Sequence, residues 1–333
     1  MGEEKEKIKC SVIIPTKNGG GIFQQVLNKV LDQEIDGIFE VVIIDSGSKD
    51  GTVEFIESIR KENKKVILRK IAPNDFGHGK TRNLGASYAN GEYLVFITQD
   101  ALPFDNAWLK NLISIFDEDS EVVGVFGKHI PYDDCDIFEK DNINRHFLNF
   151  GLDTTIFYLD DKERYERDEG YRHLLCFYSD NSSAMRKSIW EKTPYPDVDF
   201  AEDQLWAKKI IEQGYKKAYA PHSIVYHSHK YSLKEQFRRY YDEYKGLNKI
   251  YNYVPVKSIF LLPAYIFRHW KSDIQFIKES KSLTLKEKKY WRRFSLAKNI
   301  VRYLGAYLGV KGNLFPWLNM VFSREHKLIN KDG

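Results

Sequence analysis

Acidic and hydroxyl-bearing motifs follow two apolar runs near the start of the sequence. Asp45-Ser46-Gly47-Ser48 follows the run 39–44, and Thr98-Gln99-Asp100 ends the run that starts at Tyr93. The Asp45 carboxylate could bind a ribose hydroxyl or a base N–H, or the motif could be a loop that caps the next helix. Asp100 could hold Mg²⁺ or Mn²⁺ against a diphosphate if a second ligand joined it.

A glycine-rich segment lies between these motifs, at Phe76-Gly77-His78-Gly79-Lys80-Thr81-Arg82. Its Gly-Lys-Thr end resembles a P-loop, but that pattern needs glycine where Asn74 stands, so we exclude a P-loop. A glycine-rich loop that begins a helix still suits a diphosphate, because backbone amides and the cations of His78, Lys80 and Arg82 would converge there.

Two later clusters could also do chemistry. Glu202-Asp203 begins a predicted helix, whose dipole keeps a carboxylate ionised and suits a general base; the alternative is an ordinary acidic first turn. His227 and His229 share one face of a predicted strand, and imidazole binds Mn²⁺ as well as zinc. The alternative is a pair of histidines without a ligand.

The elements that must position these residues are predicted from the apolar runs. Strands are expected at 9–15, 39–44, 65–70 and 93–98, with helices at 22–31, 52–60 and 81–89. This alternation predicts an α/β fold with a mostly parallel sheet. Ligands of such sheets bind beyond the carboxyl ends of the strands, which is where Pro15–Asn18, Asp45–Ser48 and Thr98–Asp100 fall.

The later elements are less regular. We predict a helix at 107–116, a strand at 122–126, an irregular polar segment at 131–172 and a helix near 189–191. A further helix is expected to begin at 200–203 and to end at Gly214, and a strand is expected at 219–229. From Leu233 onward the pattern is helical.

Composition excludes several classes of protein. The 333 residues predict roughly two domains, and 42% hydrophobic with 29% charged residues excludes a disordered or collagen-like chain. Cys10, Cys135 and Cys176 form no C-x-x-C motif, which argues against a disulfide framework or a zinc ribbon and favours a reducing compartment. The charged start predicts no secretory signal, so we expect a cytoplasmic protein.

Charge is unevenly distributed along the chain. Residues 231–333 hold 21 Lys and Arg against 8 Asp and Glu, whereas the preceding residues hold 30 against 39. The basic part suggests a polyanionic partner, such as nucleic acid, anionic lipid or a phosphorylated substrate; the alternative is that these lysines only solvate helix surfaces.

Two apolar stretches lie in this basic region. Residues 259–267 are too few to span a bilayer, which needs about 20 apolar residues, and 303–322 is interrupted by Lys311, Asn313 and Pro316. We expect both as helices that lie on a membrane surface or pack on the rest of the protein. Flanking basic and aromatic residues such as Trp270 and Trp291 favour the membrane surface, and a helical oligomerisation or packing module is the alternative.

Together these motifs resemble the family-2 glycosyltransferases, which have a GT-A fold. The motifs that carry the resemblance are Ser11-Val12-Ile13-Ile14-Pro15-Thr16, Asp45-Ser46-Gly47-Ser48-Lys49-Asp50-Gly51-Thr52, Gly79-Lys80-Thr81-Arg82-Asn83-Leu84-Gly85, Thr98-Gln99-Asp100 and Glu202-Asp203. Phe76-Gly77-His78-Gly79, Thr98-Gln99-Asp100-Ala101 and Phe237-Arg238-Arg239-Tyr240-Tyr241-Asp242 look most like the rhamnosyltransferase branch, which uses dTDP-L-rhamnose.

The resemblance implies a role for each motif. Asp203, with Glu202, would be the catalytic base, Asp100 and His227 would bind Mg²⁺ or Mn²⁺, and His229 is the alternative ligand. Thr98 stands where the family has the first Asp of its D-x-D motif. Thr16 and Asp45 would line the pocket for the base and the ribose, and Arg82 would face the nucleotide. The complete set of residues implied to bind substrate is Pro15, Thr16, Asn18, Asp45, Ser46, Gly47, His78, Lys80, Arg82, Thr98, Gln99, Asn181 and Trp206.

The resemblance also implies an organisation and a reaction. Residues 1–230 would be the GT-A catalytic domain, with a nucleotide-sugar half at about 1–127 and an acceptor half at 128–230, and 231–333 would be a basic, aromatic, helical extension. The reaction would be inverting, metal-dependent transfer of a sugar, L-rhamnose from dTDP-L-rhamnose, to a hydroxyl of a saccharide acceptor in surface polysaccharide synthesis. That acceptor is either free or linked to polyprenyl diphosphate at the inner face of the cell membrane. The sequence leaves open whether the protein is a monomer or a homo-oligomer.

Two other functions are alternatives. One is a catalytically impaired sugar-nucleotide-binding or scaffold protein of the same fold. The other is a nucleic-acid-binding protein, which would explain the basic region but not the acidic residues at the strand ends, so we expect no nucleic acid partner.

Overall fold

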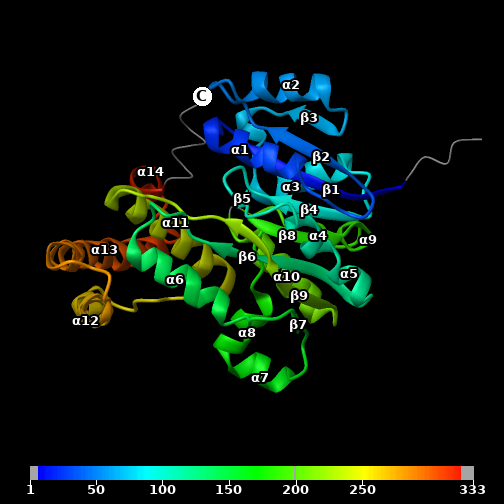
Figure 1. Cartoon of the computed structure of the whole chain (residues 1–333). Helices are drawn as coiled ribbons and strands as arrows, with labels where there is room; N and C mark the ends of the chain where they lie inside the picture. Colours follow the sequence, from blue (N-terminus) through cyan, green and yellow to red (C-terminus); the bar gives the residue numbers. More distant parts are fainter. Residues whose placement is uncertain (1–6, 199, 324–333) are drawn as a thin grey trace, which may run out of the picture. The chain divides into compact units, whose positions relative to one another are not determined.

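The structure is a computed structural model that describes residues 7–198 and 200–323. The chain forms two compact units, which divide between His229 and Lys230. Figure 1 follows the course of the chain through both units. The division of the first unit near residue 127 stays a prediction, and a strand, Val122–Ile130, runs through that position.

The first unit is built on one mixed sheet. Its strands in the described residues are β1 (Ile8–Thr16), β2 (Ile38–Asp45), β3 (Val66–Lys70), β4 (Tyr93–Ile97), β5 (Leu102–Pro103), β6 (Val122–Ile130), β7 (Thr155–Phe157), β8 (Ser182–Arg186) and β9 (Lys216–Tyr226). Their order is β3-β2-β1-β4-β8-β6-β9-β5, and β7 pairs with β9. As predicted, β1 to β4 pair in parallel, whereas β8 is antiparallel to β4 and β6.

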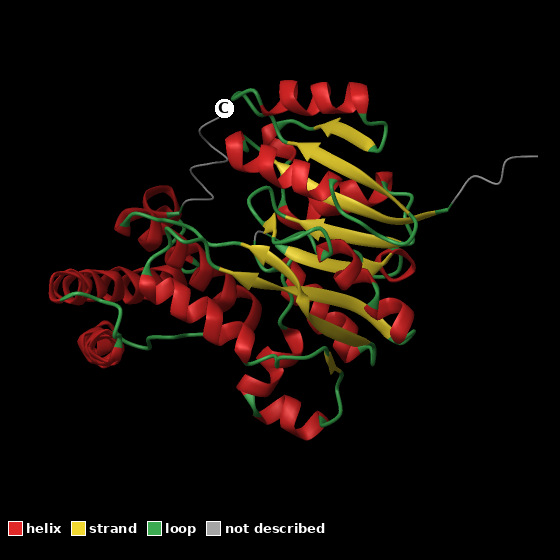
Figure 2. Cartoon of the chain, viewed as in Figure 1, coloured by secondary structure: helices red, strands yellow, loops and turns green. Residues whose placement is uncertain are grey.

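Helices cover both faces of this sheet, as Figure 2 shows. They are α1 (Gly20–Leu31), α2 (Thr52–Glu62), η1 (Pro73–Asp75), α3 (His78–Tyr88), α4 (Trp108–Ile113), α5 (Ile115–Glu118), α6 (Ile137–Leu148), α7 (Lys162–Arg167), α8 (Glu169–Cys176), α9 (Lys187–Trp190) and α10 (Glu202–Glu212). The predicted α/β fold is confirmed.

Alternating side chains of each strand enter two separate apolar cores, because successive residues of a strand point to opposite faces. In β1, Val12 and Ile14 belong to the core that includes α1 and α4, whereas Ile13 belongs to the core that includes α8 and α10. The sheet is therefore buried on both faces, which explains why β1, β2 and β4 appear as continuous apolar runs.

The prediction of an irregular segment at 131–172 is wrong, because α6, α7 and α8 fall largely within it. Each of these helices begins at an aspartate, Asp136, Asp161 or Asp168, whose side chain accepts hydrogen bonds from backbone N–H groups of the first turn. Aspartate N-caps of this kind are a sequence signal for the start of a helix, and the prediction of an irregular segment did not use them.

Two further boundaries differ from the prediction at places that matter for the site. Helix α3 begins at His78 rather than Thr81, so the glycine-rich motif lies in its first turn. Strand β9 ends at Tyr226, so His227 and His229 lie in the segment after the strand instead of on it.

The second unit is helical, as predicted. Its described elements are α11 (Leu233–Tyr251), η2 (Ile259–Leu261), α12 (Leu262–Glu279), α13 (Leu285–Gly312) and α14 (Trp317–Phe322). Among the described residues, none of the helices combines the length and the apolar character needed to cross a bilayer.

A row of glycines lets α13 approach α11 closely. A Cβ atom on Gly305 would lie 2.8 Å from the carbonyl oxygen of Phe237, and one on Gly309 would lie 2.3 Å from that of Tyr241. Tyr241 is fully buried, and its hydroxyl donates to Asn319 Oδ1 (2.9 Å). The two helix backbones therefore touch without intervening side chains.

We expect Gly309→Ala to lower the free energy of unfolding by about 1–3 kcal/mol, because overpacking outweighs the gain in helix propensity. Gly21→Ala in α1 is the matched control, since a Cβ atom there meets nothing within 4 Å. Urea unfolding of the full chain measures both, and equal stability of the two variants would contradict the close approach of α11 and α13.

Candidate active site

The ends of β1 and β4 are tied together by polar side chains. Thr16 Oγ1 donates to Gln99 Oε1 (2.8 Å), and Gln99 Nε2 donates to the carbonyl of Lys17 (3.3 Å). Thr16 is buried, whereas Pro15 is only partly buried. Gln99 therefore closes the gap between two neighbouring strand ends at the edge where ligands of parallel sheets bind.

The Asp45 carboxylate shapes the loop after β2. Its Oδ1 accepts hydrogen bonds from the backbone N–H groups of Gly47 (3.0 Å) and Ser48 (3.1 Å), and the Ser48 hydroxyl donates to Oδ2. Gly47 adopts a φ of 88°, which favours glycine. Asp45 and Ser46 are both buried, and the Asp45 carboxylate is already occupied by these hydrogen bonds within the loop. Contact of either residue with a nucleoside stays a prediction.

Three other predicted substrate residues lie nearer to solvent. Asn18 is exposed, and its Oδ1 accepts from the backbone N–H of Lys49 (2.8 Å). His78 is half-buried and Lys80 is exposed, and both lie in the first turn of α3. The positive end of a helix dipole and a lysine thus occur together, which is a suitable site for an anion.

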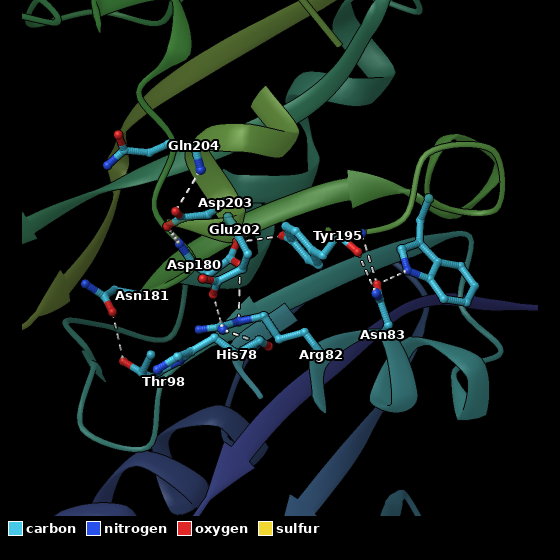
Figure 3. A network of polar contacts seen from close by, with 12 residues as sticks. His78, Arg82, Asn83, Thr98, Asp180, Asn181, Tyr195, Glu202, Asp203 and Gln204 are labelled. Carbon is cyan, nitrogen blue, oxygen red and sulfur yellow. Dashed lines mark hydrogen bonds and ion pairs between the residues drawn. The ribbon is translucent and has the colours of Figure 1, made fainter. Parts of the chain in front are cut away.

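Arg82 lies at the centre of a buried ion-pair cluster, shown in Figure 3. Its Nε lies 3.1 Å from Asp180 Oδ2, and its Nη1 lies 2.5 Å from Glu202 Oε1. All three side chains are buried. Asp180 Oδ1 also accepts from the hydroxyls of Ser183 (2.7 Å) and Tyr195 (2.7 Å). One cation therefore joins α3, α10 and the segment before β8.

This cluster bears on two predictions. Arg82 was expected to face the nucleotide; its guanidinium is buried, and its charge is compensated by Asp180 and Glu202. Glu202 was expected to act with Asp203; its carboxylate is buried against Arg82. A direct role of either residue in substrate binding or catalysis stays a prediction, and the ion pair between them joins α3 to α10.

Asp203 lies next to this cluster, at the start of α10. Its Oδ2 accepts from the backbone N–H of Asp180 (3.3 Å), and its Oδ1 accepts from that of Gln204 (2.7 Å). Burial raises the pKa of the Asp203 carboxyl well above its usual range, and the carboxylates of Glu202 and Asp180 raise it further, whereas Arg82 lowers it. The result is an unusually basic carboxylate.

Trp206 lies in the apolar core, so the structure lends no support to the prediction that it binds substrate. Its side chain is fully buried in the core beside Tyr178, and its Nε1 donates to the carbonyl of Thr193 (2.9 Å). Its position one turn after Asp203 serves to pack α10 against the sheet.

Asp100, His227 and His229 come together, as a metal site requires. His227 Nε2 lies 3.7 Å from Asp100 Oδ1, and His229 Nδ1 lies 3.7 Å from Asp100 Oδ2. One donor atom from each of the three side chains lies within 4.8 Å of the others. Pairing of β5 with β9, with Leu102 opposite Tyr226, brings these distant parts of the chain together.

Asn181 connects this cluster to the end of β4. Its amide contacts His227 Nδ1 (3.2 Å), and its Oδ1 accepts from Thr98 Oγ1 (3.3 Å). Figure 3 shows Thr98 and Asn181 side by side. Thr98 therefore supports a histidine of the cluster through Asn181.

Three residues of this region were not predicted. Asp180 and Tyr195 complete the Arg82 cluster, and His129 is buried with its ring 5.6 Å from that of His227. Burial lowers the pKa of His129 well below its usual range, and His227 lowers it further. None of these three residues lies in a recognisable sequence motif. Only Asp180 could have been noticed from the sequence, because it directly precedes Asn181, a predicted substrate residue.

We expect Arg82→Met to lower the free energy of unfolding by about 3–5 kcal/mol at pH 8, because two buried carboxylates lose their cation. The loss should be smaller at pH 5. Burial already raises the pKa of Asp180, and without Arg82, which lowers it, that folded-state pKa rises further. Stability is therefore retained at low pH and falls as the pH rises through that value. Arg60→Met, which removes an exposed ion pair with Glu57, is the control. Urea unfolding at both pH values measures the difference, and a loss equal to that of the control would contradict the cluster's importance.

The chain matches the family model "Glycosyl transferase family 2" over residues 11–192. It is 31% identical to the O-antigen chain rhamnosyltransferase RfbN of Salmonella typhimurium over 93% of this chain and 92% of that protein. It is 30% identical to the O-antigen chain rhamnosyltransferase WbaN of Salmonella anatum over 92% of this chain and 90% of that protein.

Solved structures share the fold at lower identity. One is the mannosyltransferase PcManGT of Pyrobaculum calidifontis in complex with GDP-Man and Mn²⁺, which is 18% identical in sequence and superposes with a TM-score of 0.59. The match covers 93% of this chain and 88% of the PcManGT chain. Residues 1–349 of Staphylococcus aureus TarS, in complex with UDP-GlcNAc, are 17% identical with a TM-score of 0.53, covering 89% of this chain and 91% of that chain. The predicted GT-A fold and the resemblance to rhamnosyltransferases are confirmed, and the chain belongs to glycosyltransferase family 2.

Proposed function

We propose that this glycosyltransferase moves L-rhamnose from dTDP-L-rhamnose to a hydroxyl of a saccharide acceptor, with inversion at the anomeric carbon. The observation that carries the proposal is the segment Asp180-Asn181, since the backbone N–H of Asp180 donates to Asp203 (3.3 Å) and the amide of Asn181 contacts His227 (3.2 Å). A basic carboxylate and a cluster of potential metal ligands thus flank the same two residues. The relatives named as O-antigen chain rhamnosyltransferases support the choice of sugar.

The residues around Asp100 suit a divalent cation. One carboxylate and two imidazoles converge, and such O and N donors bind Mn²⁺. We propose that Asp100 and His227 hold the cation, with His229 as a third ligand. When bound, it would neutralise negative charge on the diphosphate of the departing nucleotide. The complex of PcManGT with Mn²⁺ is a precedent within the fold.

Asp203 is the proposed general base. Its carboxylate accepts the proton of the acceptor hydroxyl while that oxygen forms a bond to the anomeric carbon, and the bond from this carbon to the diphosphate oxygen breaks. A single displacement of this kind inverts the anomeric centre. The raised pKa of Asp203 favours the proton transfer, because a more basic carboxylate is a better proton acceptor.

The first turn of α3 is proposed to bind the diphosphate of the donor. Lys80 is exposed there. The backbone N–H groups of a first helical turn lack partners within the helix, so together with Lys80 they could balance the phosphate charge. Thr16, Asp45 and Gln99, at the neighbouring strand ends, would surround the nucleoside.

We propose a growing surface polysaccharide as the acceptor, carried on polyprenyl diphosphate at the inner face of the cell membrane. The names of the two rhamnosyltransferase relatives support the polysaccharide. Membership of a glycosyltransferase family favours glycosyl transfer over the nucleic-acid-binding alternative.

We expect Asp203→Asn to lower kcat by about 10²–10⁴-fold while dTDP-rhamnose still binds, because only the proton acceptor is lost. In the unchanged enzyme, kcat should fall as the pH drops through the raised pKa of Asp203, since a protonated carboxyl cannot act as a base. Asp36→Asn, on an exposed aspartate, is the control. Product formation and donor binding are measured in parallel. Retained turnover would remove Asp203 from this role, and an unchanged enzyme that binds the donor but never turns over would favour the catalytically impaired alternative.

We expect His227→Ala to abolish Mn²⁺ binding and Asn181→Leu to weaken it by about 10–100-fold, because residues that orient a metal-ligating histidine affect affinity to that extent. His222→Ala is the control, since His222 is exposed in β9 and lies outside the cluster. Calorimetric titration with Mn²⁺ measures the affinities without turnover. Unchanged affinity of His227→Ala would exclude the Asp100 cluster as the metal site.

A further inference from the structure

A short apolar segment of the second unit is turned toward solvent. It comprises η2 and the start of α12, where Phe260 is 89% exposed and Phe267 is 60% exposed. Ile259 and Leu261 are exposed as well. Four large apolar side chains within nine residues of sequence are thus accessible, whereas single exposed apolar residues are normal on protein surfaces.

The other side of the same helix packs normally. Leu262 is buried and forms a small core with Val256 and Tyr303, against which Tyr265 and Ile266 also pack. Residues 262, 265 and 266 lie on one face of α12, and 263, 264, 267 and 268 lie on the face that remains exposed. The exposure of Phe260 and Phe267 is therefore not the result of a poorly packed helix.

The exposed apolar residues are accompanied by cations alone. Lys257, Arg268 and Lys271 are exposed, and each lies within four residues of Phe260 or Phe267 in sequence. From Tyr244 to Ser272 the sequence has five Lys or Arg and no Asp or Glu. The partner of this segment must therefore present apolar groups and negative charge together.

We propose that residues 257–271 dock on the surface of an anionic lipid bilayer. Phe260 and Phe267 would enter the boundary between headgroups and acyl chains, and Lys257, Arg268 and Lys271 would meet the headgroups. Among the described residues no helix is suited to cross the bilayer, which agrees with binding from one side. The proposal does not depend on the identity of the donor or acceptor.

Co-sedimentation of the full chain with vesicles tests this docking. Vesicles of phosphatidylcholine with one quarter phosphatidylglycerol are compared with pure phosphatidylcholine. We expect clear preference for the anionic vesicles, a loss of about tenfold or more in partitioning for Phe260→Ser, and a loss of about fivefold for Lys257→Ser. Leu285→Ser is the matched control, because Leu285 is 88% exposed but lies at the other end of the α12–α13 pair.

Three outcomes would overturn the proposal. The first is equal binding to both kinds of vesicle, and the second is an equal effect of Phe260→Ser and Leu285→Ser. The third is a dimer in solution that Phe260→Ser dissociates while vesicles are not bound, which would assign this segment to contact with a second copy. Because the assay contains neither donor nor acceptor, its failure would leave the proposed glycosyl transfer untouched.

Discussion

The pairing of one buried cation with two buried carboxylates holds the candidate active site together. Arg82 comes from α3, Glu202 from α10, and Asp180 from the segment before β8. Buried charges are costly unless each is compensated, so these three elements must stay in contact for the fold to be stable. Asp203 and Asn181 directly follow two of the three residues in sequence, and this cluster therefore fixes their positions.

The same cluster sets the chemical character of Asp203. Three carboxyl groups, those of Asp180, Glu202 and Asp203, share a single guanidinium. The imbalance leaves negative charge near Asp203, and together with burial this makes its ionised form costly and its proton affinity high. A structural ion pair and the strength of a proposed base are thus two results of one arrangement of charges.

Much of this fold could be predicted from the sequence because β1, β2 and β4 are continuous apolar runs that end in polar motifs. β8 could not be, since its five residues include Ser182 and Ser183, which are fully buried but polar. The grouping of Asp100 with His227 followed from motif order and resemblance. The contact of Arg82 with Glu202 spans 120 residues, and Trp206 is a core residue within a catalytic motif; no local pattern distinguishes either from a substrate contact.

The antiparallel direction of β8 has a topological consequence. Parallel strands offer only their carboxyl ends at this edge of the sheet, but β8 begins there, with Ser182 opposite Ile97, the last residue of β4. Asp180 and Asn181 directly precede a strand that is paired on two sides, with β4 and with β6. The pair of residues that links the proposed base to the proposed cation site is therefore placed by the start of an antiparallel strand, and not by the carboxyl end of a parallel one.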